Sequence, residues 1–271
     1  MQSQVRLKCY FIILLLFTGI NLRAEITVSG LLERGNEQFV KRDYSEKGIK
    51  HAESARYNYR RVAEKSDSDM EGIYARARCA QTYDFLAAAY TSKQEIITAH
   101  FRGFEIAFGG FIYLERIYGT HYKNMPPKDE KLLADLTYYW ALNLSKWIKL
   151  NGGGYKGQWS QINKRFNLTF RMGHDYMADY GAYRILGEHS NNGNQLKLAY
   201  EKTKLAGPDS PSANGWNNIA YAKYLKEKGD VDRAKSILDG FVSYGPEELS
   251  MDLIPENRKL QQIAMEIIRK W

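Results

Sequence analysis

The feature that most constrains the fold of this chain is an internal sequence repeat in its second half. The segment YRILGEHSNNGNQLKLAYEKTKLAGPDSP, which begins at Tyr183, superposes on NIAYAKYLKEKGDVDRAKSILDGFVSYGP, which begins at Asn218. The superposition pairs small residues and prolines at a constant interval of 35 residues: Gly187 with Ala222, Ala199 with Ala234, and Pro211 with Pro246. Self-similarity at such a period predicts stacked helical hairpins.

The residue types fit this architecture. Glycine or alanine stands where the two helices of a hairpin must approach closely, and proline, which lacks an amide hydrogen, is expected to stop the second helix. The intervening NNGN and KGD stretches have turn chemistry. We therefore expect two clear repeats at 180–213 and 215–248, covered by a C-terminal capping helix at 255–271.

The rest of the chain also has helical patterns, and few runs show the alternation typical of strands. The sequence predicts an all-α fold, a single α-solenoid domain over residues 25–271. Three further hairpins are expected from the segments 31–43 with 44–65, 70–90 with 93–119, and 129–150 with 157–173.

The N-terminus has the form of a secretory signal peptide at 1–24. Arg6 and Lys8 precede an apolar run of 11 residues, Tyr10 to Ile20, and Ala24 offers a small residue for cleavage. That run is shorter than the roughly 20 residues of a membrane-spanning helix. The mature chain is expected to be exported, periplasmic or secreted, with no membrane span.

Composition argues against a nucleic-acid partner. Loss of the three basic residues in 1–24 lowers the formal net charge from +8 to +5, and Lys and Arg alternate with acids along the chain. A nucleic-acid-binding protein concentrates its basic residues on one face.

No motif for a metal, a cofactor or a catalytic residue is found. Cys79 is the only cysteine of the mature chain and lies in an alanine-rich run typical of a helix core, and the five histidines are scattered. A carboxylate pair leaves no spacing pattern, so an enzyme with an unrecognised carboxylate site stays open as an alternative.

The glycine-rich stretch NGGGYKGQW at 151–159 raises the question of a phosphate loop. Gly152 and Gly157 have the right spacing, but Gln158 and Trp159 stand where lysine and a hydroxyl residue are required. The stretch also follows a predicted helix, not a strand. We interpret it as the turn of a hairpin.

The helix before that turn carries the best candidates for a binding site. Spacings of three and four place Trp140, Asn143 and Trp147 on one face, next to Tyr139. An amide between two indoles must find hydrogen-bond partners or lose about 1–3 kcal/mol. The row is either a core contact in which Asn143 holds a neighbouring backbone, or one wall of a ligand cavity. Arg184 is either a ligand anchor or part of a surface salt bridge.

The repeat resembles the tetratricopeptide repeat. Signature positions are matched in the first copy by Tyr183, Leu186, Gly187, Ala199, Ala206 and Pro211, and in the second by Ala222, Leu225, Ala234, Leu238 and Pro246, while Phe241 replaces the usual alanine.

The segments TYYWALNLSKWIKLNG, YGAYRILG and PENRKLQQIAMEIIRKW are similar to the exported T-component family associated with TRAP transporters. That resemblance implies oligomers around an apolar passage and docking of a solute-binding protein. Two departures are the missing lipid-anchoring cysteine and the short loop after Gly187.

The sequence thus favours a non-enzymatic, exported helical-repeat protein that binds another protein, together with an apolar small ligand in a central cavity. A structural assembly factor of the envelope is a further alternative to the enzyme. The candidate binding residues are Tyr139, Trp140, Asn143, Trp147 and Arg184.

Overall fold

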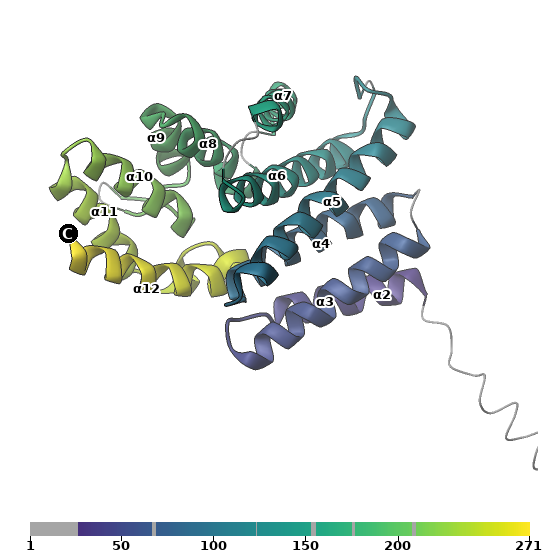
Figure 1. Ribbon diagram of the computed structural model, residues 1–271, viewed down its shortest axis with the longest axis horizontal. Helices are drawn as coiled ribbons and strands as arrows, with labels where there is room; N and C mark the ends of the chain where they lie inside the picture. The colour runs from purple at the N-terminus through teal and green to yellow at the C-terminus, as the bar shows by residue number, and fades with distance from the viewer. Residues whose placement is uncertain (1–26, 67–68, 123, 153–155, 175–176, 208–209) are drawn as a thin grey trace, which may run out of the picture.

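The computed structural model describes residues 27–66, 69–122, 124–152, 156–174, 177–207 and 210–271, and the predicted signal peptide lies outside them. Within these ranges the chain folds into 11 α-helices and no strand (Figure 1). The all-α prediction is therefore confirmed. The helices are α2 (Val28–Val40), α3 (Glu46–Lys65), α4 (Met70–Ala89), α5 (Lys93–Tyr118), α6 (Pro127–Leu150), α7 (Lys156–Arg171), α8 (Met177–Ser190), α9 (Gly193–Lys202), α10 (Gly215–Glu227), α11 (Val231–Ser243) and α12 (Ile254–Lys270).

Local chemistry explains where most helices begin. The side chains of Thr27, Ser45 and Asp69 each accept a hydrogen bond from the backbone amide three residues later, at the starts of α2, α3 and α4. Pro127 occupies the first turn of α6, where its missing amide hydrogen is not needed. These caps are sequence-local, which is why the predicted and observed starts lie close together.

Consecutive helices of the N-terminal half pack side by side, from α2 through α6. Two glycines of α5 permit its close contact with α6. A Cβ atom at Gly103 would lie 2.5 Å from the Asn143 side chain, and one at Gly110 would lie 2.7 Å from Leu136. The interface between α5 and α6 therefore depends on these two residues being glycine.

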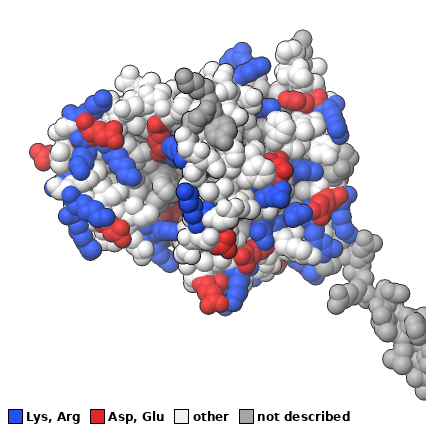
Figure 2. All heavy atoms as spheres, in the orientation of Figure 1, with Lys and Arg blue, Asp and Glu red and all other residues white. Residues whose placement is uncertain are grey.

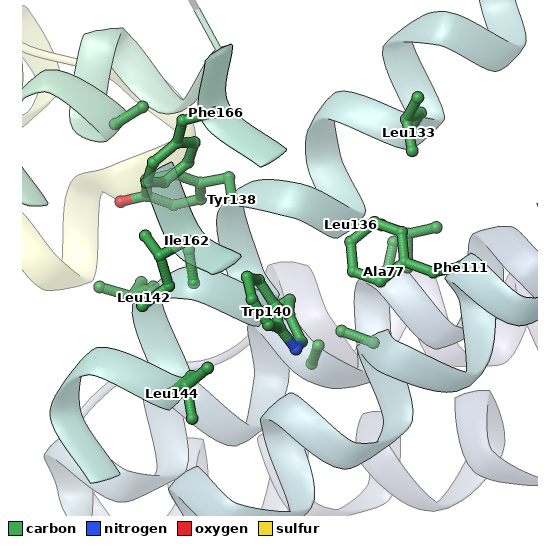
Figure 3. Close-up of a cluster of buried hydrophobic side chains, with 14 of the residues drawn as sticks. Ala77, Phe111, Leu133, Leu136, Tyr138, Trp140, Leu142, Leu144, Ile162 and Phe166 are labelled. Carbon is green, nitrogen blue, oxygen red and sulfur yellow. The ribbon is translucent and has the colours of Figure 1, made fainter. Parts of the chain in front are cut away.

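The largest hydrophobic core lies around α6. Figure 3 shows Trp140 among side chains from α4, α5, α6 and α7, including Phe111 and Ile162. The rings of Trp140 and Phe111 meet edge to face with centroids 5.9 Å apart. Buried Asn143 donates to the Ala80 carbonyl of α4 at 3.1 Å, and its Oδ1 lies 3.0 Å from Nδ1 of His100 in α5. One amide thus joins three helices.

The predicted repeats form two helical hairpins, α8–α9 and α10–α11, but their register differs from the sequence superposition. The N-cap residues Asn192 and Asp230 are 38 residues apart, not 35. Gly187 lies five residues before its N-cap, whereas Ala222 lies eight before. Asn191, at φ 50°, turns the chain early after α8, while α10 continues to Glu227 and turns through Gly229 at φ 89°.

Proline does not end the second helix of the first hairpin. Helix α9 ends at Lys202, and Pro211 lies in an irregular segment that contains an isolated bridge between Lys204 and Ser212. The expected small-residue packing is nevertheless present. Ala199, Ala222 and Ala234 are fully buried, and a Cβ atom at Gly187 would lie 2.7 Å from Leu196 of α9.

Other sequence features lie as follows. Gly152, at φ 92°, follows α6 in the glycine-rich turn, of which residues 153–155 lie outside the described part. Cys79 is buried in the core between α3 and α4, and burial raises the pKa of its thiol to about 12.

Basic and acidic side chains are intermixed on the face of the molecule that Figure 2 shows. None of the described helices is long and apolar enough to cross a membrane.

Asn143→Ala should lower the free energy of unfolding by about 2–4 kcal/mol, because it leaves buried polar groups of α4 and α5 without their partner. Urea denaturation would measure the change. Asn163→Ala, at an exposed position of α7, is the matched control and should change stability by less than about 0.5 kcal/mol. Equal effects of the two substitutions would contradict the role of Asn143 as a junction of three helices.

Candidate functional site

A cavity of about 450 Å³ lies between the two halves of the molecule. Helices α4 and α6 form one side, and the beginning of α10 and the segment that leads into α12 form the other. A second hollow, of about 910 Å³, adjoins it between the α2–α3 connection and α12. The two share Arg78, Gln81 and Asp252 as lining residues.

One face of α6 supplies much of the lining. Its members are spaced three or four residues apart, so that they form a stripe beside the apolar stripe that packs on α5. They are Lys131, Asp135, Tyr138, Tyr139, Leu142 and Lys146. Helix α6 therefore separates the core from the cavity.

The cations at one end of the cavity have partners. Lys146 Nζ lies 2.6 Å from Asp84 of α4, and Arg184 of α8 donates to the Tyr138 hydroxyl at 3.2 Å and to Glu188 at 3.4 Å. The Trp216 ring centre lies 5.4 Å from Lys146 Nζ and 5.9 Å from the Arg184 guanidinium carbon. These contacts stabilise the buried positive charges.

The pKa of Asp84 follows from this pairing. Burial alone would raise the pKa of its carboxyl group, but the ammonium of Lys146 and the nearby His100 bring it below the ordinary value. Burial and Lys146 lower the pKa of His100. At neutral pH this end of the cavity holds an ionised carboxylate beside an ammonium, with a neutral imidazole behind them.

The other end of the cavity contains an acid without a partner. Within the described part of the chain, Asp135 makes no hydrogen bond and no ion pair. Burial raises the pKa of its carboxyl group to about 6, and the nearby charges of Lys131, Arg78 and His174 only partly oppose that shift. Burial and the Asp135 charge also raise the pKa of the neighbouring Tyr139 phenol.

Arg78 does not serve as that partner. Its guanidinium carbon lies 4.5 Å from the ring centre of Phe39 in α2, and it donates to Gln81 on its own helix. The Nε–H groups of Arg78 and Arg184 are buried and have no hydrogen-bond partner among the described residues. Among the described residues, the side chains that line the cavity therefore include two buried N–H donors and one carboxylate without a hydrogen-bond partner.

The wall opposite α4 is held by contacts between the ends of the chain. Arg42, which follows α2, forms an ion pair of 3.1 Å with Glu256 of α12, and the side chains are 6% and 16% exposed. Arg42 also donates to the Asp252 carbonyl at 2.6 Å. Lys259 donates to the Ala88 carbonyl of α4. Figure 1 shows that α12 (yellow) begins beside the N-terminal helices and runs away from them to the C-terminus.

The five predicted binding residues fall into two groups. Tyr139 and Arg184 line the cavity. Trp140 and Asn143 are buried in the core, and Trp147 packs against Phe101 and Phe104 of α5 with centroids 6.1 and 5.6 Å apart. None of these three lines either hollow. Their positions match the core interpretation of the row.

Other lining residues were not singled out from the sequence. They include Arg78, Asp84, Asp135, Lys146 and Trp216. The sequence pattern that could have indicated them is a second stripe of α6, next to the apolar stripe. In this second stripe Asp135, Tyr139 and Lys146 follow one another at helical spacing. A charged stripe normally faces solvent, so the pattern alone does not indicate a cavity.

No cluster of three or more potential metal ligands is present among the described residues. No family model matches this chain, and neither the curated proteins nor the solved structures contain a significant match to it.

Arg42→Met should destabilise the protein by about 3 kcal/mol, because Glu256 is left buried without its counter-ion. The double variant Arg42→Met/Glu256→Leu should recover at least half of that loss, because burial already raises the pKa of Glu256 despite the ion pair. Urea denaturation at pH 7 would measure both. A double variant as unstable as the single one would show that the pair itself is stabilising.

Asp135→Asn should stabilise the protein at neutral pH. Because the pKa of Asp135 is about 6 in the folded state, above the ordinary 3.8, the folded state binds this proton more tightly than the unfolded chain. Its contribution to stability is therefore fully present below about pH 4 and is lost as the pH rises through about 6. The substitution should add about 1–3 kcal/mol at pH 7.5 and much less at pH 4.

Thermal or urea unfolding at the two pH values tests this expectation. Asp239→Asn, on the exposed face of α11, makes the same chemical change outside the cavity and should have no such pH dependence. A loss of stability at pH 7.5 in Asp135→Asn would mean that the carboxylate is compensated within the fold.

Proposed function

We propose that this chain is an exported, non-enzymatic helical-repeat protein that holds another molecule in the cavity between α4, α6 and α12. The observation that carries the proposal is the composition of the cavity wall. Buried and half-buried charged groups and aromatic rings converge there from helices that are distant in sequence, including Asp135, Tyr139, Arg184 and Trp216. If stability were the only requirement at this position, apolar side chains would stabilise the fold as well as these charged groups or better.

The size and chemistry of the cavity support binding of a small molecule. A volume of about 450 Å³ lies within the roughly 300–1,000 Å³ of ligand sites, which combine apolar walls with a few polar anchors. Tyr74, Phe85, Tyr139 and Leu142 offer ring and aliphatic surface. The charges make this cavity less apolar than the one expected from the sequence, so the proposed ligand is amphipathic.

The finer architecture that we propose is a tetratricopeptide-like solenoid in which α12 covers the last hairpin. The contacts between consecutive helices and the two C-terminal hairpins support it. The different spacing of the N-caps means that the first hairpin departs from the repeat pattern. Docking of a solute-binding protein of a TRAP-type system, and assembly into oligomers, are proposed on the sequence resemblance alone.

An enzyme is the second candidate, because two cavity carboxyl groups have pKa values shifted in opposite directions, that of Asp84 downwards and that of Asp135 upwards. Asp84 contacts Lys146, which lies 11 residues after Asp135 on α6, or about 16 Å along the helix axis. The two catalytic carboxyl groups of glycoside hydrolases lie about 5–10 Å apart. Asp84 is held by Lys146, and no hydrogen bond among the described residues links it to Asp135, so we favour binding over catalysis.

Blocking the cavity tests the binding proposal. Ser250→Trp places a large ring at the rim, on an irregular segment that can accommodate it, and Ser243→Trp makes the same change on an exposed position of α11. Each protein is incubated with an extract of its native envelope, purified again and analysed by native mass spectrometry.

We expect the wild type and Ser243→Trp to carry a co-purifying small molecule, and Ser250→Trp to retain at least tenfold less. Circular dichroism would establish that both variants are folded. Absence of a bound molecule from the wild type, or equal retention by Ser250→Trp, would refute the proposal that this cavity holds a molecule of the envelope.

A further inference from the structure

The charges in the cavity are not compensated evenly. At the end near α8 and α10, Lys146 is paired with Asp84 and Arg184 with Glu188, and the ring of Trp216 lies close to both cations. At the end near the start of α6, the Asp135 carboxylate has no hydrogen-bond or ion-pair partner among the described residues. Asp135 is therefore the acid of the cavity wall that has no polar partner among the described residues, and it is the group that we consider as a ligand anchor.

The surroundings of Asp135 are suited to an organic cation. Tyr74 and Tyr139 line the cavity with Asp135, and Tyr138 lies next to it on the same stripe of α6. The faces of tyrosine rings attract ammonium groups, with an energy of about 0.5–2 kcal/mol that increases when water is excluded. A carboxylate next to such rings provides both the charge and the shape of an amine site.

The cations near Asp135 do not fill this role. The guanidinium of Arg78 is turned towards Phe39 and hydrogen-bonds Gln81. The Lys131 side chain is exposed to solvent, and His174 contacts Glu130 at 3.3 Å. Each lies near enough to affect Asp135, but neither Lys131 nor Arg78 comes within ion-pair distance of it. A buried acid that is left in this state is stabilised by a partner of opposite charge.

We propose that the Asp135 end of the cavity binds the ammonium group of a small organic amine, whose apolar body lies along Tyr139 and Leu142. This assignment rests on the proposed binding function and names the chemical class of its ligand. At the far end Lys146 and Arg184 each form an ion pair with a carboxylate, so an organic anion would have to compete there with Asp84 and Glu188.

Three probes of similar size test the assignment: phenethylamine, the neutral 2-phenylethanol and the anion phenylacetate. Isothermal titration calorimetry of the purified protein at pH 7.5 would measure their binding. We expect phenethylamine to bind at least tenfold more tightly than 2-phenylethanol, a difference of about 1.4 kcal/mol. Phenylacetate should bind more weakly than either.

Asp135→Asn should reduce the affinity for phenethylamine to that for 2-phenylethanol, while Asp239→Asn should leave it unchanged. The variant keeps the shape of the side chain and is expected to be at least as stable as the wild type, so a loss of binding is not a loss of folding. Failure of phenethylamine to bind, tighter binding of phenylacetate, or full amine affinity in Asp135→Asn would overturn the proposal.

The two proposals fail in different ways. If the wild type carries a co-purifying molecule that Ser250→Trp lacks, and phenethylamine does not bind, then the cavity is a binding site and only the amine assignment is wrong. If no molecule co-purifies but phenethylamine binds through Asp135, the proposal that the cavity holds an envelope molecule is wrong and only the amine site stands.

Discussion

Burial of α6 on two opposed faces is the constraint on which the rest of the structure depends. The helix contributes 14 buried residues of 24, and they include polar ones such as Thr137, Asn143 and Ser145. A helix buried in this way must satisfy its polar side chains inside the protein. Asn143 does so by joining α4 and α5, and Thr137 and Ser145 donate to carbonyls of α6 itself.

The same helix determines the character of the cavity. One stripe of α6 is committed to the core through Leu136 and Trp140, and the adjacent stripe presents Asp135, Tyr139 and Lys146 to the hollow. Because the two stripes share one rigid helix, the spacing between the negative and positive ends of the cavity is set by helix geometry. Core packing and site geometry are therefore coupled through a single element.

Closure of the cavity depends on contacts between the two ends of the chain. Arg42 and Glu256 are 214 residues apart in sequence and meet in a largely buried pair, with Lys259 reaching α4 beside them. Removing such charges from water has a cost that their attraction only partly offsets, as the raised pKa of Glu256 indicates. We interpret the pair as an interaction that positions α12 against the N-terminal helices.

The sequence by itself determined the helices, because caps, prolines and apolar periodicity act over a few residues. It also offered both roles for the row of Trp140, Asn143 and Trp147, and the tertiary structure placed that row against α5 and the core. The register of the first hairpin could not be derived, since the short turn at Asn191 and the early end of α9 do not follow the superposed pattern.

Only the tertiary structure decided that Tyr139 and Arg184 share a cavity. It also decided that Asp84 has a partner there, while Asp135 has none among the residues that the structure describes. The physical reason is that charge pairing and burial are set by residues brought together from distant segments, which helical periodicity does not encode.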